Sequence, residues 1–255
     1  MSETYDVAVI GAAGRMGSQV CQAVAAADGL RLVGRYDVGD DLGDLGGADV
    51  VVEFSVPSAS PGNVAACVAQ GVHVVVGTTG WDDARLDALR AQVAAAPQAR
   101  TGGGVGVLIA PNFAIGAILM MRFAQQAARF YESVEVVELH HPDKVDAPSG
   151  TAARTARLVA AARAEAGLGG IPDATTQDLD GARGAKVDGV HVHAVRLRGL
   201  VAHQEVLFGG VGEQLTIRHD SFDRASFMPG VLAGVRGVAP HPGVTVGLEH
   251  YLGLG

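Results

Sequence analysis

The chain has 255 residues, a formal net charge of −8 and a hydrophobic content of 48%. This hydrophobic content argues against a disordered chain, and the negative charge argues against non-specific nucleic-acid binding, which needs a basic face. The N-terminus does not look like a signal peptide, and the longest apolar run, residues 113–121, is too short to cross a bilayer. We therefore expect a soluble, cytoplasmic protein with no membrane or nucleic-acid partner.

Short apolar runs alternate with helical spacing through the first half of the chain. Strands are expected over residues 6–10, 31–37, 48–54, 72–76 and 105–110, and helices over 15–27 and 81–96. Strands that alternate with helices form right-handed βαβ units around a parallel sheet. The pattern therefore predicts an α/β domain with a Rossmann-like, doubly wound parallel sheet.

The pattern changes after Asn112. Helices are expected over residues 113–131, 150–166 and 227–238, with a strand over 133–139 and an exposed excursion over 167–188. Three strand-like runs follow at 191–197, 203–208 and 214–219, and their short connections favour antiparallel pairing. These residues predict a second, α+β domain with an open mixed sheet.

The two cysteines, Cys21 and Cys67, fall in alanine-rich windows with helical spacing. Neither has a second cysteine or a histidine at the spacing that metal ligands need. We therefore expect two reduced, buried thiols rather than a disulfide or a zinc site.

A glycine-rich turn of spacing Gly-x-x-Gly-x-x-Gly separates the first strand from the first helix. Gly11 permits the sharp turn, Gly14 lets backbone N–H groups approach a pyrophosphate, and Gly17 lets the helix pack closely on the sheet. Asp37 follows Gly17 by twenty residues, at the end of the second strand. A carboxylate at that place binds the adenosine ribose of a dinucleotide, so the turn predicts a nucleotide cofactor.

The same turn fits either of two cofactors. Asp37 favours NADH, because its carboxylate accepts from the ribose hydroxyls. Arg15 and Arg35 lie nearby, where either can pair with the 2′-phosphate of NADPH or remain a solvated surface charge. We therefore expect NADH, NADPH or both.

Two further turns follow strands at the edge of the sheet where doubly wound folds bind their ligands. In the first, Thr78 and Thr79 can contact a nicotinamide riboside, and Thr79 with Gly80 can also form a helix N-cap and turn. In the second, Asn112 can line the cofactor, cap the following helix, or do both.

A loop between a predicted strand and a predicted helix carries adjacent histidines and a lysine. An enzyme that delivers hydride to carbon must also protonate the atom that gains charge, and His140 has the intrinsic pKa for this near neutrality. Lys144 can offset anionic charge, or donate a proton if burial lowers its pKa. Ser149, Gly150 and Thr151 open the next helix with N–H groups and hydroxyls that hold a carboxylate.

A metal site in this loop is disfavoured. Zinc needs further cysteine, histidine or carboxylate ligands at suitable spacing, and the loop offers only Asp143 and Asp146. Six further histidines have no partner that the sequence identifies, and we expect them to be structural or surface residues: His191, His193, His203, His219, His241 and His250.

Six motifs give the chain a family resemblance. They are GAAGRMG (11–17), VEFS (52–55), GTTG (77–80), APNFAIG (110–116), ELHHPDKVDAPSGTA (138–152) and VAHQEVLFGG (201–210). In this order, over nearly the whole chain, they resemble the 4-hydroxy-tetrahydrodipicolinate reductases, also called dihydrodipicolinate reductases, of the actinobacterial type. The motif ELHHPDKVDAPSGTA is highly specific for that family.

The resemblance implies a reductase of lysine and diaminopimelate biosynthesis that transfers hydride from NADH or NADPH to a cyclic imine dicarboxylate. It implies catalytic roles for His140 and Lys144, and substrate contacts from His141, Ser149, Gly150 and Thr151. It implies that the cofactor is lined by Gly11, Ala12, Ala13, Gly14, Arg15, Met16, Asp37, Gly77, Thr78, Thr79, Ala110, Pro111, Asn112 and Phe113.

The resemblance also implies a domain organisation and an assembly. Residues 1–112 would form the dinucleotide-binding domain, with 222–255 returning to it, and 113–221 the substrate-binding and oligomerisation domain of a homotetramer. The chain departs from the family at Arg35, which is often not basic in relatives, and at residues 101–106, an apparent insertion expected to form a flexible bulge.

Two other hypotheses stay open on the residues alone. The chain could be another amino-acid-pathway dehydrogenase that acts on a semialdehyde, although the double histidine and the Ser-Gly-Thr turn speak against it. It could also be a nucleotide-sensing regulatory protein without turnover, in which case the histidine-lysine loop would be idle.

Overall fold

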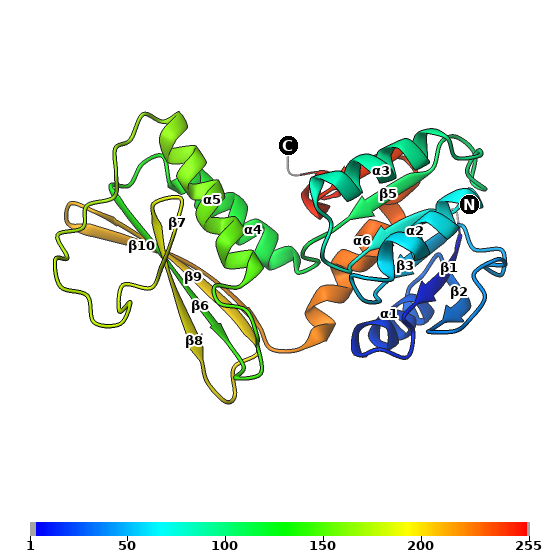
Figure 1. Cartoon of the computed structure of the whole chain (residues 1–255), viewed down its shortest axis with the longest axis horizontal. Helices are drawn as coiled ribbons and strands as arrows, with labels where there is room; N and C mark the ends of the chain where they lie inside the picture. Colours follow the sequence, from blue (N-terminus) through cyan, green and yellow to red (C-terminus); the bar gives the residue numbers. More distant parts are fainter. Residues whose placement is uncertain (1–3, 254–255) are drawn as a thin grey trace. The chain divides into compact units, whose positions relative to one another are not determined.

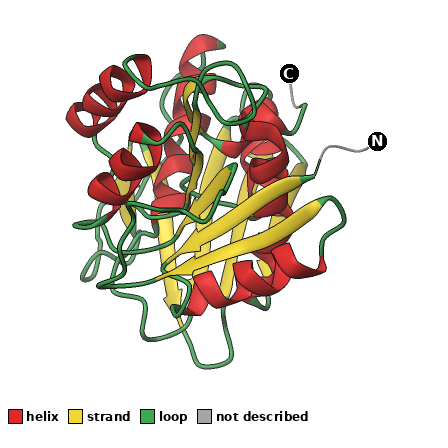
Figure 2. Ribbon diagram, turned by 90° about the vertical axis from the view of Figure 1, so that its right-hand side faces the viewer, coloured by secondary structure: helices red, strands yellow, loops and turns green. Residues whose placement is uncertain are grey.

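The computed structural model describes residues 4–253, which divide into two compact units. One unit contains the described residues up to Ala114 together with those from Arg224 onward, and the other runs from Ile115 to Asp223. Figure 1 labels most of the helices and strands of both units, and Figure 2 colours helices and strands differently in a second view. Each unit is built around a sheet of its own.

The first unit holds a six-stranded sheet in the order β11-β5-β4-β3-β1-β2, and all its pairings are parallel. Because β1 lies between β2 and β3, the chain changes direction across the sheet at β1. Open sheets of this kind bind ligands beyond the carboxyl ends of the strands at such a switch point. The strands are β1 (Tyr5–Ile10), β2 (Leu30–Tyr36), β3 (Val50–Glu53), β4 (His73–Val76), β5 (Gly106–Ile109) and β11 (Gly243–Val246).

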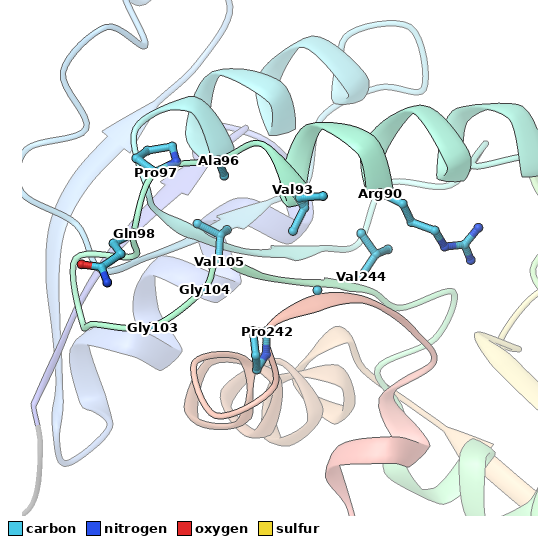
Figure 3. Close-up of a pocket in the computed structure, with 12 residues that line it drawn as sticks. Arg90, Val93, Ala96, Pro97, Gln98, Gly103, Gly104, Val105, Pro242 and Val244 are labelled. Atoms are coloured by element: carbon cyan, nitrogen blue, oxygen red, sulfur yellow. The ribbon is translucent and has the colours of Figure 1, made fainter.

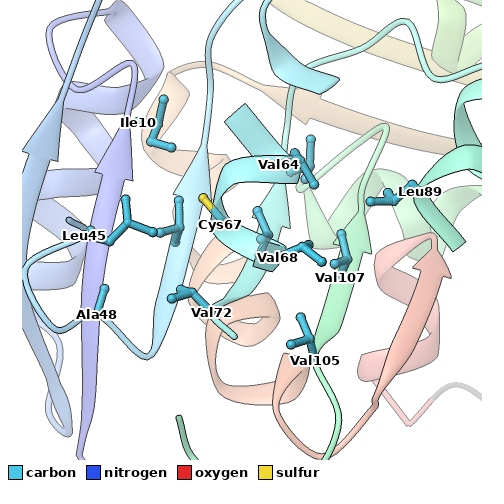
Figure 4. Packing of buried hydrophobic residues seen from close by; sticks show 14 of the residues in the cluster. Ile10, Leu45, Ala48, Val64, Cys67, Val68, Val72, Leu89, Val105 and Val107 are labelled. Atoms are coloured by element: carbon cyan, nitrogen blue, oxygen red, sulfur yellow. The ribbon is translucent and has the colours of Figure 1, made fainter. Parts of the chain in front are cut away.

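Helices cover both faces of this sheet. α1 (Arg15–Ala26) and α6 (Met228–Val238) pack on one face, and α2 (Ser60–Ala69) and α3 (Asp83–Ala94) on the other. The central strands are buried along their whole length, as expected for a parallel sheet that is covered twice. Figure 4 shows the aliphatic core between the sheet and α2, in which Val64, Cys67 and Val107 are fully buried.

The second unit holds a mixed five-stranded sheet in the order β10-β9-β6-β8-β7. Two helices, α4 (Ile115–Ala127) and α5 (Gly150–Glu165), pack against each other and against this sheet. The strands are β6 (Ser133–His140), β7 (Ala185–Val187), β8 (Val190–Arg196), β9 (Ala202–Gly210) and β10 (Glu213–Ser221). The predicted fold class, a doubly wound parallel sheet plus a second α+β part with a mixed sheet, is thus confirmed.

The expected antiparallel pairing of all three late runs is wrong in one place. β9 and β10 do pair antiparallel, but β8 does not pair with β9, because β6 lies between them. β6 pairs parallel with β8 and antiparallel with β9. Two strands also lie where none was expected: β7, inside the excursion 167–188, and β11, beyond α6. They have 3 and 4 residues, too few for an alternating pattern to stand out.

Residues 101–106 form a turn that a buried histidine holds at both ends. Nδ1 of His73 accepts a hydrogen bond from the N–H of Gly106 at 2.9 Å, and Nε2 lies 2.8 Å from Oγ1 of Thr101. Because Nδ1 accepts, Nε2 carries the proton and donates to Thr101. Gly102 and Gly103 have φ values of 89° and 76°, which other residues rarely adopt. The expected bulge is therefore anchored to the core through His73, a residue that no motif marked.

Both cysteines are buried in the first unit, and neither forms a disulfide. Burial raises the pKa of Cys67 to about 12, and it also raises the pKa of Cys21. None of the described helices combines the length and apolar character that a membrane-spanning segment needs.

Candidate active site

The glycine turn leaves β1 and leads directly into α1. Gly11 has a φ of 79°, and a Cβ atom there would lie 2.1 Å from the carbonyl oxygen of Phe54. A Cβ atom on Gly17 would lie 2.0 Å from the carbonyl oxygen of Gly11, so the helix can approach the turn only without side chains at these positions. Gly14 is the N-cap of α1 and offers no side-chain cap. The first amides of α1 therefore fit a pyrophosphate, as a dinucleotide requires.

Asp37 follows β2 and is tied to the glycine turn. Its carboxylate accepts hydrogen bonds from the N–H of Ala13 at 2.7 Å and from the N–H of Val38 at 2.9 Å. These two hydrogen bonds, of which the one from Val38 has the larger effect, hold the pKa of Asp37 below its usual value. Arg15 and Arg35 are exposed. The turn thus presents a fixed carboxylate and two exposed cations to a ligand bound beside it.

A cavity of about 320 Å³ lies beside the turn, at the carboxyl ends of β1, β3 and β4. A Cβ atom on Gly77 would lie 2.0 Å from the ring of Phe54, so glycine is needed there for the cavity wall to close. The cavity brings together residues of the glycine turn, of the segment after β3 and of the turn after β4: Gly14, Arg15, Met16, Phe54, Ser55, Pro57, Gly77, Thr78 and Thr79.

A buried carboxylate supports this wall. Glu53, the last residue of β3, is fully buried and accepts hydrogen bonds from the hydroxyls of Ser55 and Ser60 and from the amide of Asn63. The N–H of Ser55 donates to Oγ1 of Thr78 at 2.9 Å. Through Ser55, Glu53 therefore fixes the position of a threonine that faces the cavity.

The third predicted turn, 110–113, follows β5 but does not line the cavity. The ring of Phe113 packs on that of Phe54 with centroids 5.6 Å apart. Phe54 lines the cavity and Phe113 does not, so Phe113 contacts the cavity wall without facing the cavity. Oδ1 of Asn112 accepts the N–H of Ala114 at 2.8 Å, just before α4. The N–H of Ala110 continues the sheet pairing, and Pro111 is exposed.

The alternative role of Thr79, as a helix N-cap, is wrong. α3 begins at Asp83, and its N-cap is Asp82, whose Oδ1 accepts the N–H of Arg85 at 2.9 Å. An aspartate at this position satisfies a helix amide better than a threonine three residues earlier can. Thr79 is exposed at the cavity instead.

The histidine-lysine loop joins β6 to α5 in the second unit. His140 is the last residue of β6, with 14% of its side chain exposed, and its Nδ1 forms a hydrogen bond with the fully buried Glu138. Burial lowers the pKa of His140, the hydrogen bond from Glu138 opposes this, and the charges of Lys144 and Arg196 add to the lowering. The imidazole is therefore balanced between one anion and two cations.

Lys144, which is half-buried, and His141, which is exposed, lie together in this loop. The N–H of Lys144 donates to the carbonyl oxygen of His141 at 3.3 Å, and its Nζ forms an ion pair with Asp146 at 2.6 Å. Lys144 lowers the pKa of Asp146. The lysine thus has a partner within the loop that a bound anion would have to replace or share.

Ser149 begins α5, but its side chain is turned inward. Oγ of Ser149 accepts the N–H of Ala152 at 3.2 Å, the N–H of Ser149 donates to Glu138 at 3.1 Å, and only 3% of the residue is exposed. Gly150 is exposed and Thr151 half-buried at the first turn of α5. The positive end of the helix dipole therefore faces outward at Gly150 and Thr151, where an anion is stabilised.

A larger cavity, of about 590 Å³, lies at the other edge of the first sheet (Figure 3). Val105 and Val244 line it at the amino ends of β5 and β11, with Arg90 and Val93 contributed by α3. Doubly wound sheets bind ligands at the carboxyl ends of their strands. The smaller cavity beside the glycine turn is therefore the candidate cofactor site.

The motifs alone assign no role to Glu53, Ser55 or Glu138, which support the two sites. A signal was present, because Glu53 and Glu138 are carboxylates inside apolar strands, and such groups are buried only with partners. Among the described residues, no group of three or more histidine, cysteine, aspartate or glutamate side chains is placed to hold a metal ion.

A doubly wound sheet with a glycine turn at its switch point, and a second unit that carries an imidazole and an ammonium group in one loop, define a nucleotide-dependent oxidoreductase. The family model for the N-terminus of dihydrodipicolinate reductase matches residues 5–113, and the model for its C-terminus matches residues 116–252. The chain belongs to the dihydrodipicolinate reductase family, whose members are reductases that use a pyridine nucleotide.

Curated relatives and a solved structure agree with this membership. The chain is 62% identical to the 4-hydroxy-tetrahydrodipicolinate reductase of Cutibacterium acnes, over 97% of this chain and 98% of the relative. It is 61% identical to that of Nocardia farcinica, over 98% of this chain and all of the relative. The dipicolinate-bound dihydrodipicolinate reductase from Paenisporosarcina sp. TG-14 is 34% identical, with a TM-score of 0.82 over 98% of this chain and 100% of that one.

Proposed function

We propose that the chain reduces 4-hydroxy-tetrahydrodipicolinate to tetrahydrodipicolinate in lysine and diaminopimelate biosynthesis. The hydroxyl group leaves as water together with a hydrogen from a neighbouring ring carbon, and the ring gains one hydride and one proton. The reduced nicotinamide of NADH or NADPH supplies the hydride. The observation that carries the proposal is the 62% identity to a reductase of this name over 97% of the chain.

In this proposal the second unit holds the substrate and supplies the proton. As hydride reaches a ring carbon conjugated to the C=N bond, negative charge develops toward the ring nitrogen, and His140 or Lys144 protonates it. Gly150 and Thr151 bind one substrate carboxylate at the positive end of α5, with Ser149 holding that turn in place. His141, exposed in the same loop, contacts the substrate.

The first unit is the dinucleotide-binding domain in this proposal. Gly11 to Met16 bind the pyrophosphate, Asp37 binds the adenosine ribose, and Gly77 to Thr79 and Ala110 to Phe113 lie toward the nicotinamide half. Both nucleotides are substrates, because Asp37 suits the free ribose while Arg15 and Arg35 suit its 2′-phosphate.

The second unit also mediates assembly into a homotetramer in this proposal. Support comes from the sheet face that points away from α4 and α5. On that face Val137, Leu139 and Leu207 are only half-buried, whereas their strand neighbours Val136 and Val206 are fully buried. Sedimentation equilibrium of the purified chain tests this assembly directly.

Nucleotide oxidation, followed by the loss of nicotinamide absorbance while dihydrodipicolinate synthase supplies fresh substrate, tests the function. We expect substrate-dependent oxidation, and we expect His140→Ala to lower kcat by about 100-fold or more without changing nucleotide affinity. Tight nucleotide binding without turnover would instead indicate a regulatory protein. Turnover with a semialdehyde alone would indicate another dehydrogenase.

A further inference from the structure

Glu138 occupies an unusual position for a carboxylate. It lies in β6 two residues before His140, so strand alternation places both side chains on the same face of the sheet. It is fully buried, and its neighbours on that face, Val134 and Val136, are buried valines. Burial of an ionised carboxylate is costly unless hydrogen bonds and an opposite charge compensate it.

The donors around Glu138 come from the histidine-lysine loop, from the start of α5 and from Arg196 on β8. Oε2 accepts from His140 and from Nη1 of Arg196 at 2.8 Å, and Oε1 accepts from Nη2 of Arg196 at 2.8 Å and from the N–H of Ser149 at 3.1 Å. Arg196 also donates to the carbonyl oxygen of Asp146, at the end of the loop that carries Lys144. One carboxylate thus joins the end of β6, the first turn of α5 and the loop between them.

We propose that Glu138 is the positioning residue of the proton-transfer step: it fixes the tautomer and orientation of His140, and it holds the first turn of α5 in register with that imidazole. The proposal rests on the proposed function. A carboxylate can only accept a hydrogen bond, so Nδ1 of His140 must carry a hydrogen, and Nε2 is left as the atom that exchanges a proton with the substrate. Nε2 has no hydrogen-bond partner among the described residues.

The charges around the imidazole explain why an anion is needed there. Burial, Lys144 and Arg196 all lower the pKa of His140, and Glu138 is the group that raises it. Burial by itself would raise the pKa of Glu138, but hydrogen bonds from Arg196 and His140 hold it below its usual value. Arg196 therefore keeps Glu138 ionised, and Glu138 limits the fall in the pKa of His140 that burial, Lys144 and Arg196 cause.

Glu138→Gln tests the proposal, because it keeps the shape and removes the charge. The imidazolium is the proton donor, so activity falls as pH rises through the pKa of His140. Without Glu138 that pKa is lower, and we expect the alkaline limb of the kcat profile to move down by about one pH unit or more. Nucleotide affinity should not change, because the nucleotide binds in the first unit. A uniform loss of kcat at every pH would contradict the proposal.

The chain offers a matched control on the same strand. Glu135, on the opposite face of β6, also pairs with an arginine, Arg183, and a histidine, His193. Glu135→Gln therefore removes an equivalent Glu-Arg-His cluster without touching His140. We expect its pH profile to stay unchanged, and a shift equal to that of Glu138→Gln would overturn the proposal.

Two measurements separate positioning from mere structural support. In a His140→Ala background, Glu138→Gln should lower kcat no further, whereas additive losses would show that Glu138 does not act through His140. Nitrogen NMR of histidine-labelled wild-type protein should find the neutral His140 ring protonated at Nδ1. The other tautomer would overturn the proposal even if every Glu138 variant failed to fold. This spectrum needs no substrate, so it stands apart from any failure of the proposed reaction.

Discussion

The carboxylate of Asp37, at the end of β2, accepts a hydrogen bond from the N–H of Ala13 in the glycine turn at 2.7 Å. This contact joins two consecutive strands at the switch point of the sheet, and it leaves an ionised carboxylate where a dinucleotide places its adenosine ribose. A 2′-phosphate bound there would meet a fixed negative charge.

Asp37→Ser should therefore shift nucleotide preference toward NADPH. The variant removes the repulsion of the 2′-phosphate and leaves Arg15 and Arg35 available to it. We expect the ratio of kcat/KM for NADPH to that for NADH to rise about tenfold, or ~1.4 kcal/mol. Asp41→Asn, in the same loop, is the control, because the one hydrogen bond that Asp41 accepts from the described part of the chain comes from the local N–H of Gly43. An unchanged ratio in Asp37→Ser would remove Asp37 from the ribose site.

Gly17→Ala should destabilise the first unit and weaken nucleotide binding together. The added Cβ would lie 2.0 Å from the carbonyl oxygen of Gly11, so α1 must move away from the turn. We expect a loss of about 1–3 kcal/mol in the free energy of unfolding, measured in urea. Gly62→Ala, in α2, is the control, since its Cβ would meet nothing within 4 Å. We expect Gly62→Ala to be neutral or stabilising.

The features that the sequence predicted best are those with a strong local signal. A distinctive local pattern marks each of these features. The glycine turn has its glycine spacing, strands β3 and β4 have short valine-rich runs, and the long helix α5 has helical spacing behind an N-cap serine. The position of β6 between β8 and β9 has no such signal, because strand order depends on contacts between residues far apart in sequence.

The site shows the same division. The motifs point directly to His140 and Gly11. They do not reveal the roles of Glu138, which opens the motif 138–152, and of His73, because those roles depend on the partners that folding brings to them. His73 bonds Thr101 and Gly106 across about 30 residues of chain. A pattern within one segment carries no trace of such a pairing.

His73 should make the first unit sensitive to acid. Burial lowers its pKa below the ordinary value of 6.5, so below that value the unfolded chain binds a proton that the native protein does not. The free energy of unfolding therefore falls as pH drops below about 6.5, and this contribution is absent at higher pH. His73→Gln should flatten the pH dependence by up to one proton.

Urea unfolding between pH 5 and pH 8, followed by the fluorescence of the single tryptophan, Trp81, measures this slope in the unit that contains His73. His250→Gln, at an exposed position of the same unit, is the control. If His73→Gln and wild type showed equal slopes, His73 would not be the titrating group.

Arg163→Met should destabilise the second unit. Arg163 is buried near the end of α5, and its guanidinium donates to the carbonyl oxygens of Tyr131, Glu132 and Gly169. Methionine fills similar space but leaves these carbonyls without donors, which costs about 3 kcal/mol. Arg157→Met, on an exposed face of the same helix, should cost less than about 0.5 kcal/mol. Amide hydrogen exchange in α5 distinguishes the two, and equal protection would refute the role given to Arg163.

The two shielded thiols have a practical consequence for following ligand binding. Alkylating reagents attack the thiolate, and neither Cys21 nor Cys67 is accessible or readily ionised. A cysteine introduced at Val145, which is fully exposed next to Lys144, would then be the one group that takes up a maleimide dye. A dye on this single introduced cysteine would therefore follow ligand binding at the loop, and Cys21 and Cys67 would not have to be replaced first.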